Sequence, residues 1–445
     1  MKKIKLGVAA VALMASAVAL AKGGAQDCVA GRVDKVVPDY APGETMTFTV
    51  EVRGFAEADK SQWQFKWERT ADDGKKETGV APAAQPFAYR TSLDRPGFVR
   101  FQGWLLDGAG KPVRKVNGRG KEVDVRFDLG AGVEIGKIRQ GVPEPKDFDA
   151  LWAKHKANLA TVAWKDGVTL KEIASPTAGV KLYEFSVPCF GGKPATGHLS
   201  VPSDAARKYP AVARFFGYNE SWTYKRAIVP PEKLSRSEIM MRVSAHGFEM
   251  GRDESYYKEE RTKVKSNGFG HGFDPVQNAD PEKTYYAGMT YRLMRALEYL
   301  KTRPEWNGRD LTVTGGSQGA LQSIWAAALV PGVSRCNISI PWNCDIGGTE
   351  VGRNRGDWYV KWVPALGYYD TCNMAPRIPK SCVVAVTAGL GDYICPPTGV
   401  MAFYNALVAP KSIVFTQNME HGNNLQGAPV QRFRIDGDKK VNPSP

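Results

Sequence analysis

The chain has 445 residues, of which 43% are hydrophobic and 24% charged, and its formal net charge is +14. This composition is that of a globular protein, and the length exceeds what one ordinary core accommodates, so two domains are expected. The basic residues are scattered, and no basic stripe interleaved with aromatic residues occurs. The charge pattern therefore argues against nucleic-acid binding and favours a charged, solvated surface.

Residues 1–21 have the pattern of a cleavable signal peptide: a lysine-containing start, an apolar run and small residues. Ala19 and Ala21 form an A-x-A site, which predicts cleavage before Lys22. The apolar run is short and rich in alanine for a membrane span, although an uncleaved anchor is the alternative. We therefore expect a periplasmic or secreted protein with no membrane span after cleavage. Loss of the three signal-segment lysines lowers the charge from +14 to +11.

Cysteine and histidine positions give little sign of a metal site. The chain has seven cysteines, none of them in a C-x-x-C pair, and five histidines without ligand spacing among themselves or with cysteine. We expect no metal and no cofactor. Export permits disulfides, the odd count leaves at least one thiol unpaired or externally paired, and the sequence does not assign the pairs.

Residues 28–130 are expected to form an all-β domain. Short segments of alternating apolar and polar residues are separated by turn signals. The expected strands lie at 45–52, 62–67, 97–106 and 121–129. This pattern resembles a small β-sandwich of the immunoglobulin or fibronectin type III kind. The aromatic row Trp63, Phe65 and Trp67 is more typical of a sandwich core than of a sugar-binding platform.

Glycine- and proline-rich stretches at 130–132 and 140–145 are typical of a linker. An amphipathic helix is expected over 147–159, where His155 is a packing or surface residue. From about residue 168, strands and helices alternate, which is the signature of an α/β sheet. Further strands are expected at 182–187, 195–201, 210–216, 239–244, 334–340, 381–387 and 411–416, with helices at 284–300 and 400–407. Residues 252–283 are weakly patterned and are interpreted as a surface excursion.

The most informative motif is the Gly-x-Ser-x-Gly turn from Gly315 to Gly319. A buried strand is expected before it, at 311–314, and a helix after it, at 322–329. Such a strand-to-helix turn exposes a nucleophilic serine beside the free N–H groups of a helix start. Ser317 is therefore the candidate nucleophile, and the backbone N–H of Gln318 is a candidate oxyanion donor. A plain glycine turn before a core helix is the alternative.

A serine nucleophile needs a base, and the base needs a carboxylate to orient it. In α/β hydrolases the chain order is serine, acid, histidine. His421 is the one histidine after Ser317, and it follows the last expected strand. Asp392 follows the strand before that and is the expected acid. Competing acids are Asp345, Asp370 and Glu420.

The second oxyanion donor of an α/β hydrolase lies in a loop after an earlier strand. The strand expected at 210–216 ends in Gly217-Tyr218, so the Tyr218 N–H is the candidate, with a simple glycine turn as the alternative. These features predict an α/β hydrolase over residues 135–430, with a doubly wound, mostly parallel sheet.

Residues from about 135 to 425 resemble the acetyl xylan esterase and cephalosporin C deacetylase family, carbohydrate esterase family seven. The matching motifs are Tyr-Tyr-x-x-x-x-Tyr-Arg-x-x-x-Ala over 285–296, Gly-Gly-Ser-Gln-Gly over 315–319, Gly-Leu-Gly-Asp over 389–392 with Cys-Pro-Pro over 395–397, and Phe-Gly-Tyr over 216–218. The resemblance implies the same site: Ser317, Asp392 and His421 as nucleophile, acid and base, with the N–H groups of Tyr218 and Gln318 as oxyanion donors.

Three segments depart from the family pattern. The family usually has Arg-Gly-Gln-Gly where this chain has 245–248, His where it has Phe216, and His-Glu where it has Glu420-His421. These departures bear on acyl-group and substrate preference. Family members form ring-like hexamers, so a homo-oligomer is possible here, although the extra N-terminal region could alter the assembly.

The leading hypothesis is a secreted or periplasmic serine carboxylesterase. It would remove acetyl groups from glycans such as xylan through an acyl-enzyme, so its partner is an acetylated oligo- or polysaccharide. A feruloyl-type esterase or peptidase on the same fold is the first alternative, with an aromatic pocket formed by Trp342 or Tyr368. A glycan-binding protein with a lapsed site is the second.

Overall fold

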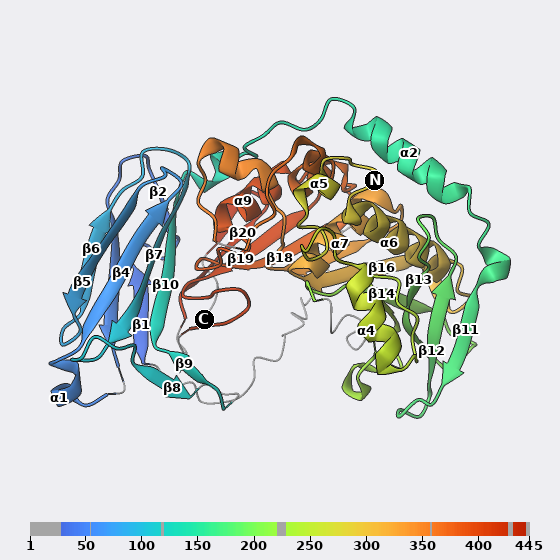
Figure 1. Cartoon of the computed structure of the whole chain (residues 1–445), viewed down its shortest axis with the longest axis horizontal. Helices are drawn as coiled ribbons and strands as arrows, with labels where there is room; N and C mark the ends of the chain where they lie inside the picture. Colours follow the sequence, from blue (N-terminus) through green and yellow to red (C-terminus); the bar gives the residue numbers. More distant parts are fainter. Residues whose placement is uncertain are drawn as a thin grey trace, which may run out of the picture.

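The computed structural model describes residues 28–53, 55–116, 120–219, 228–356, 358–425 and 430–441. The predicted signal segment, residues 1–21, lies outside the described residues. Figure 1 shows a β-rich N-terminal region beside one end of a large sheet that carries helices. Across the described part of the chain, no helix is both long and apolar enough to cross a membrane.

The N-terminal region contains two main sheets. One has the order β1-β3-β6, and the other has the order β2-β10-β7-β4-β5. The strands of the first are β1 (Val29–Val33), β3 (Met46–Val52) and β6 (Phe87–Thr91). Those of the second are β2 (Asp39–Tyr40), β4 (Gln64–Ala71), β5 (Lys76–Pro82), β7 (Gly97–Leu106) and β10 (Arg126–Val133). A short helix α1 (Glu57–Lys60) and a β8 (Arg114–Val116) and β9 (Glu122–Asp124) hairpin complete the region.

These two sheets bury a shared apolar core. Alternate residues of β3 are buried, as the period-two pattern predicts, and Phe48 contacts Phe101 of β7 at 5.4 Å between ring centroids. Phe65 is fully buried, and Trp67 packs against Phe101 at 5.9 Å. Phe65 thus lies in the core, as predicted, and Trp63 and Trp67 are partly buried against it. The immunoglobulin-like topology remains a prediction.

The large sheet has eleven strands in the order β11-β12-β13-β15-β14-β16-β17-β18-β19-β20-β21. Its central strands pair in parallel: β14 (Tyr209–Arg214), β15 (Ile239–Val243), β16 (Trp306–Gly316), β17 (Arg335–Ser339), β18 (Val383–Gly389) and β19 (Lys411–Thr416). The outer strands pair antiparallel: β11 (Thr169–Ile173), β12 (Val180–Val187), β13 (Ala195–Pro202), β20 (Arg432–Asp436) and β21 (Lys439–Val441). The sheet is therefore mixed, which corrects the prediction of a mostly parallel one.

Helices lie along this sheet (Figure 1), and eleven of the twelve residues of α7 are buried. Leu321, Ile324 and Trp325 of α7 are fully buried, because the helix packs on β16, β17 and α6. The helices are α2 (Phe148–Ala160), α4 (Glu254–Lys263), α5 (Pro275–Asn278), α6 (Tyr285–Lys301), α7 (Gln318–Leu329), α8 (Thr371–Met374) and α9 (Pro397–Ala406). Short 3₁₀ helices lie at Ile135–Lys137, Lys165–Gly167, Pro231–Lys233, Ile346–Val351, Pro364–Tyr368 and Ala375–Arg377.

Two segments differ from the sequence-based expectation. Residues 130–132, expected in a linker, belong to β10, where a Cβ on Gly130 would lie 2.6 Å from the Leu390 carbonyl oxygen. Gly130 therefore allows β10 to lie close to the loop after β18, and it does not mark a flexible linker. Residues 252–283, expected as an irregular excursion, contain α4 and α5.

Candidate active site

Ser317 lies on the sharp turn between β16 and α7. Its backbone has φ 57° and ψ −123°, a sparsely populated conformation for a residue with a side chain. Its N–H donates to the Ser339 carbonyl at 3.1 Å, and its carbonyl accepts from the Leu321 N–H at 3.1 Å. The strained turn is therefore fixed by the neighbouring strand and by the first turn of the helix.

Glycines on each side of Ser317 permit this turn. A Cβ on Gly315 would lie 2.5 Å from the Gly319 carbonyl oxygen, and a Cβ on Gly319 would lie 2.5 Å from the Phe215 carbonyl oxygen. Both contacts are with backbone atoms, which have little room to move aside. The motif thus brings α7 close to both β16 and the end of β14.

The structure brings Ser317, His421 and Asp392 together in one hydrogen-bonded row. His421 Nε2 lies 3.0 Å from Ser317 Oγ, and His421 Nδ1 lies 3.0 Å from Asp392 Oδ2. The Asp392 side chain is buried, whereas the His421 side chain is 24% exposed. A hydrogen bond from Nδ1 to the carboxylate leaves Nε2 able to accept the serine proton.

Two loops that follow neighbouring parallel strands carry the acid and the base. Asp392 follows β18 and His421 follows β19, and the loops are joined by hydrogen bonds from Leu390 N to Thr416 O at 2.9 Å and from Gly391 N to Met419 O at 3.1 Å. The two side chains therefore meet because the loops after adjacent strands are bonded to each other.

The competing carboxylates have other partners. Asp345 pairs with Arg353, and Asp370 accepts the Ile346 N–H at 2.6 Å and is the N-cap of α8. Burial raises the pKa of Asp370 to about 6. Glu420 forms an ion pair with Arg126 of β10.

The side chains of Tyr218 and Gln318, whose backbone N–H groups are the predicted oxyanion donors, both contact His271, which no sequence motif marks. Gln318 is the first residue of α7, so its N–H has no intrahelical acceptor. Its side-chain Nε2 lies 3.0 Å from His271 Nε2, and His271 stacks on the Tyr218 ring with centroids 3.9 Å apart. His271 is fully buried, although it belongs to the segment expected at the surface. Its sequence context, a glycine-rich polar stretch, carries no periodic signal.

Aromatic side chains surround Tyr218. Trp342 and Trp358 meet its ring edge-on at 5.8 Å and 5.2 Å, and Phe273 stacks parallel to Trp358 at 5.9 Å. Trp358 is 38% exposed, whereas Trp342 is buried. Tyr368, the other residue considered for an aromatic pocket, instead stacks on Phe148 of α2 at 6.2 Å.

The ligand-type atoms of Asp392, Cys395 and His421 lie within 4.8 Å of one another. His421 Nδ1 is already bonded to Asp392, and burial raises the pKa of the Cys395 thiol well above its usual value. The contact between His421 and Asp392 is that of an acid and base pair, with the buried Cys395 thiol beside it. The six cysteines from Cys189 to Cys395 carry free thiols.

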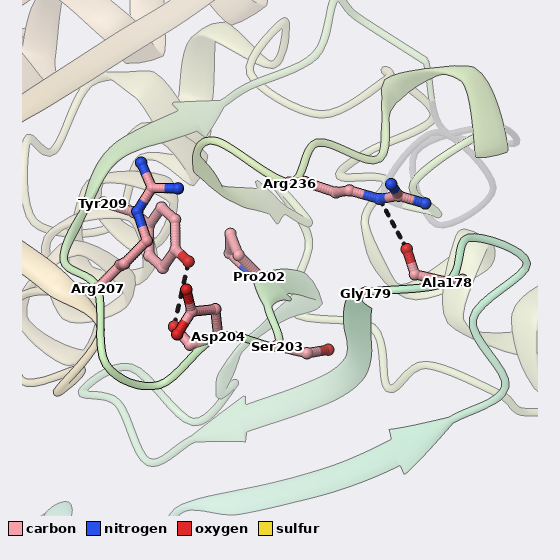
Figure 2. Close-up of a pocket in the computed structure, with 8 residues that line it drawn as sticks. All are labelled: Ala178, Gly179, Pro202, Ser203, Asp204, Arg207, Tyr209 and Arg236. Carbon is pink, nitrogen blue, oxygen red and sulfur yellow. Dashed lines mark hydrogen bonds between the residues drawn. The ribbon is translucent and has the colours of Figure 1, made fainter.

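A hollow of about 430 Å³, lined by the residues drawn in Figure 2, lies at the start of β14. Tyr209, in its wall, is the first residue of β14 and pairs with Trp306, the first residue of β16. Ser317 follows the opposite, carboxyl end of β16. Arg236 Nε donates to the Ala178 carbonyl at 2.8 Å across the hollow. The hollow and the serine turn therefore lie at opposite edges of the sheet.

A family model and a curated relative point to the same kind of enzyme. The model of the acetyl xylan esterase (AXE1) family matches residues 127–350 and 354–436. The acetyl esterase Axe7A of Xylanibacter ruminicola is 30% identical over 291 residues, which cover 62% of this chain and 63% of that protein's length. The chain thus matches less than two thirds of this curated relative.

Solved structures show the same fold. An acetyl xylan esterase from Paenibacillus sp. R4 has a TM-score of 0.54 at 21% identity, covering 66% of this chain and 94% of that one. Acetyl xylan esterase 1 from a Thermoanaerobacterium species has a TM-score of 0.51 at 22% identity, covering 65% and 92%. The chain thus contains the α/β hydrolase fold of these enzymes, and it belongs to the acetyl xylan esterase family.

Proposed function

We propose that the protein is a serine carboxylic ester hydrolase that removes small acyl groups, chiefly acetyl, from glycans such as xylan. The observation that carries this proposal is the continuous row of hydrogen bonds from Ser317 Oγ through His421 to Asp392. Membership of the acetyl xylan esterase family supports the same reaction class.

The reaction would proceed through an acyl-enzyme. His421 Nε2 removes the Ser317 proton as Oγ attacks the ester carbonyl, and the protonated imidazole then gives that proton to the departing sugar oxygen. A water molecule, deprotonated by the same nitrogen, releases the acid and regenerates the serine. Throughout, Asp392 orients the ring and stabilises its charged form.

The tetrahedral intermediate carries a negative charge on the former carbonyl oxygen. The N–H of Gln318, at the start of α7, is suited to this charge because a helix N-terminus favours anions. We assign the Tyr218 N–H as the second donor, because the Tyr218 and Gln318 side chains both contact His271. The stacked imidazole would thus help to fix the loop that presents this donor.

We propose that residues 28–130 form a separate immunoglobulin-like domain and that the chain is exported. The separate buried cluster of the two N-terminal sheets supports the first proposal, and the signal-like segment 1–21 supports the second. Export predicts a mature N-terminus at Lys22, which N-terminal sequencing of the periplasmic or secreted protein would check. Retention of residues 1–21 would contradict it.

A panel of esters tests the proposed substrate class. We expect acetate release from acetylated xylo-oligosaccharides to exceed, in kcat/KM, the hydrolysis of matched feruloyl esters and of peptides. Faster feruloyl release would favour an aromatic acyl site near Trp342 and Trp358 instead. No hydrolysis of any ester would contradict the proposal as a whole.

A further inference from the structure

The segment that carries His421 lies against β10 of the N-terminal region, and Figure 1 shows β10 facing the end of the sheet where β19 lies. The Gln417 side chain bonds both backbone groups of Gly130: it accepts the N–H at 3.0 Å and donates to the carbonyl at 2.6 Å. The side-chain oxygen of Asn418 accepts the Asp128 N–H at 2.8 Å. The start of the histidine loop is thus bonded side by side to β10.

Glu420 extends this contact to the residue before the histidine. Its carboxylate forms an ion pair with Arg126, 294 residues earlier in the chain. The side chains of Glu420 and Arg126 are 14% and 37% exposed, so the pair is partly shielded from water. Since Glu420 and His421 share a peptide unit, holding the first side chain restricts the backbone that aims the second.

The acid loop meets the same strand. A Cβ on Gly391 would lie 2.7 Å from both the Cβ and the carbonyl oxygen of Asp128, so this loop touches β10 directly. Arg100 of β7 donates from Nε to Asp128 at 2.9 Å and lies 4.3 Å over the ring of Tyr393, the residue after Asp392. β10 therefore supports both loops that carry the acid and the base.

Arg126 lies outside the residues that match the family model, which begin at 127, whereas Glu420 lies inside them. We propose that Arg126 and Glu420 are positioning residues: from β10, the ion pair holds the His421 loop in the geometry that brings the imidazole to Ser317. The N-terminal region is then part of the active-site framework. This inference rests on the proposed function.

The charge on Glu420 changes in an accessible pH range. Burial raises its pKa to about 7, although Arg126 opposes the shift. Glu420 is therefore charged and fully paired above neutral pH and protonated below it. The charged or titratable groups that face it are Arg126 and Asp128 of β10, Arg100 of β7, Asp392 of the acid loop and the adjacent His421.

Glu420→Gln tests the inference through a pH profile. Misplacing the base is expected to lower kcat by about 10-fold to 100-fold at about pH 8, with little change in KM. The ratio of wild-type kcat to variant kcat should fall towards 1 at about pH 6, because wild-type Glu420 is then protonated and resembles glutamine. A deficit that is the same at all pH values would mean a merely structural role and would overturn the proposal.

Arg126 variants supply the matched test. Arg126→Gln should lower kcat as Glu420→Gln does, Arg126→Lys should restore most of it, and the double variant should lose no more than either single one. Arg114→Gln, which removes another arginine of this region with a 60% exposed side chain, is the control and should keep wild-type activity. If the fold-loss of kcat in the double variant equalled the product of the two single losses, the two residues would act independently and not through one ion pair.

Hydrogen exchange gives a readout that does not depend on catalysis. Amides of residues 417–421 should exchange faster in Arg126→Gln than in the wild type and in Arg114→Gln. Unchanged exchange would overturn the positioning inference even if Ser317 proves essential. If Ser317 proves dispensable, the proposed function fails while the exchange result still reports on the contact.

Discussion

Replacing Ser317 by alanine is expected to lower kcat for acetyl ester hydrolysis by about 10⁴-fold or more. The change removes the Ser317 hydroxyl that the proposed acyl-enzyme requires and leaves the strained turn in place, because alanine has the same Cβ. Initial rates of acetate release, with circular dichroism to verify folding, would measure it.

The control is Ser203→Ala, which removes an exposed hydroxyl at the distant hollow in Figure 2. It should hydrolyse acetyl esters at the wild-type rate. If Ser317→Ala retained more than about a tenth of wild-type activity, direct hydrolysis by an activated water would have to replace the covalent route.

Replacing Asp392 by asparagine is expected to lower kcat by about 10⁴-fold at neutral pH, because the asparagine would favour the wrong tautomer of His421. Asp392 Oδ1 accepts the N–H groups of Ile394 at 3.0 Å and Cys395 at 2.9 Å. An asparagine would keep its oxygen in that position and turn its NH₂ group toward His421 Nδ1. The imidazole would then carry its hydrogen on Nε2 and could not accept the Ser317 proton.

A comparison with Asp345→Asn separates the candidate acids. Asp345 pairs with Arg353 and accepts the Gly141 N–H at 2.7 Å, so its replacement should cost stability rather than chemistry. Per folded molecule, the Asp345→Asn enzyme should therefore stay within about tenfold of wild-type kcat. A larger loss in Asp345→Asn than in Asp392→Asn would reverse the assignment.

The three side chains of the site were predictable because each is marked by a short sequence pattern or by its order along the chain. The glycines around Ser317 mark a turn that only small residues permit, and chain order singled out His421 and Asp392. The structure brings these three side chains within hydrogen-bonding distance. The strands of the parallel centre were likewise predictable, since short segments rich in apolar residues alternate there with helices and loop signals.

Other features depend on contacts between distant segments, which the sequence pattern does not encode. Gly130 suggested a linker, whereas its small size serves the approach of β10 to Leu390. His271 lies in a polar stretch yet is buried between Tyr218 and Gln318. The partner of Glu420 is equally invisible in sequence, because Arg126 lies 294 residues away.

The proposed reaction depends on the activation of Ser317 by His421. Mass spectrometry after treatment with a fluorophosphonate, which reacts with activated serines, measures this activation. We expect one adduct per wild-type chain, on Ser317, and labelling slower by about 10³-fold or more in His421→Ala. If a wild-type protein that hydrolyses esters formed no adduct on Ser317, or if His421→Ala were labelled at the wild-type rate, His421 would not be the base that activates Ser317.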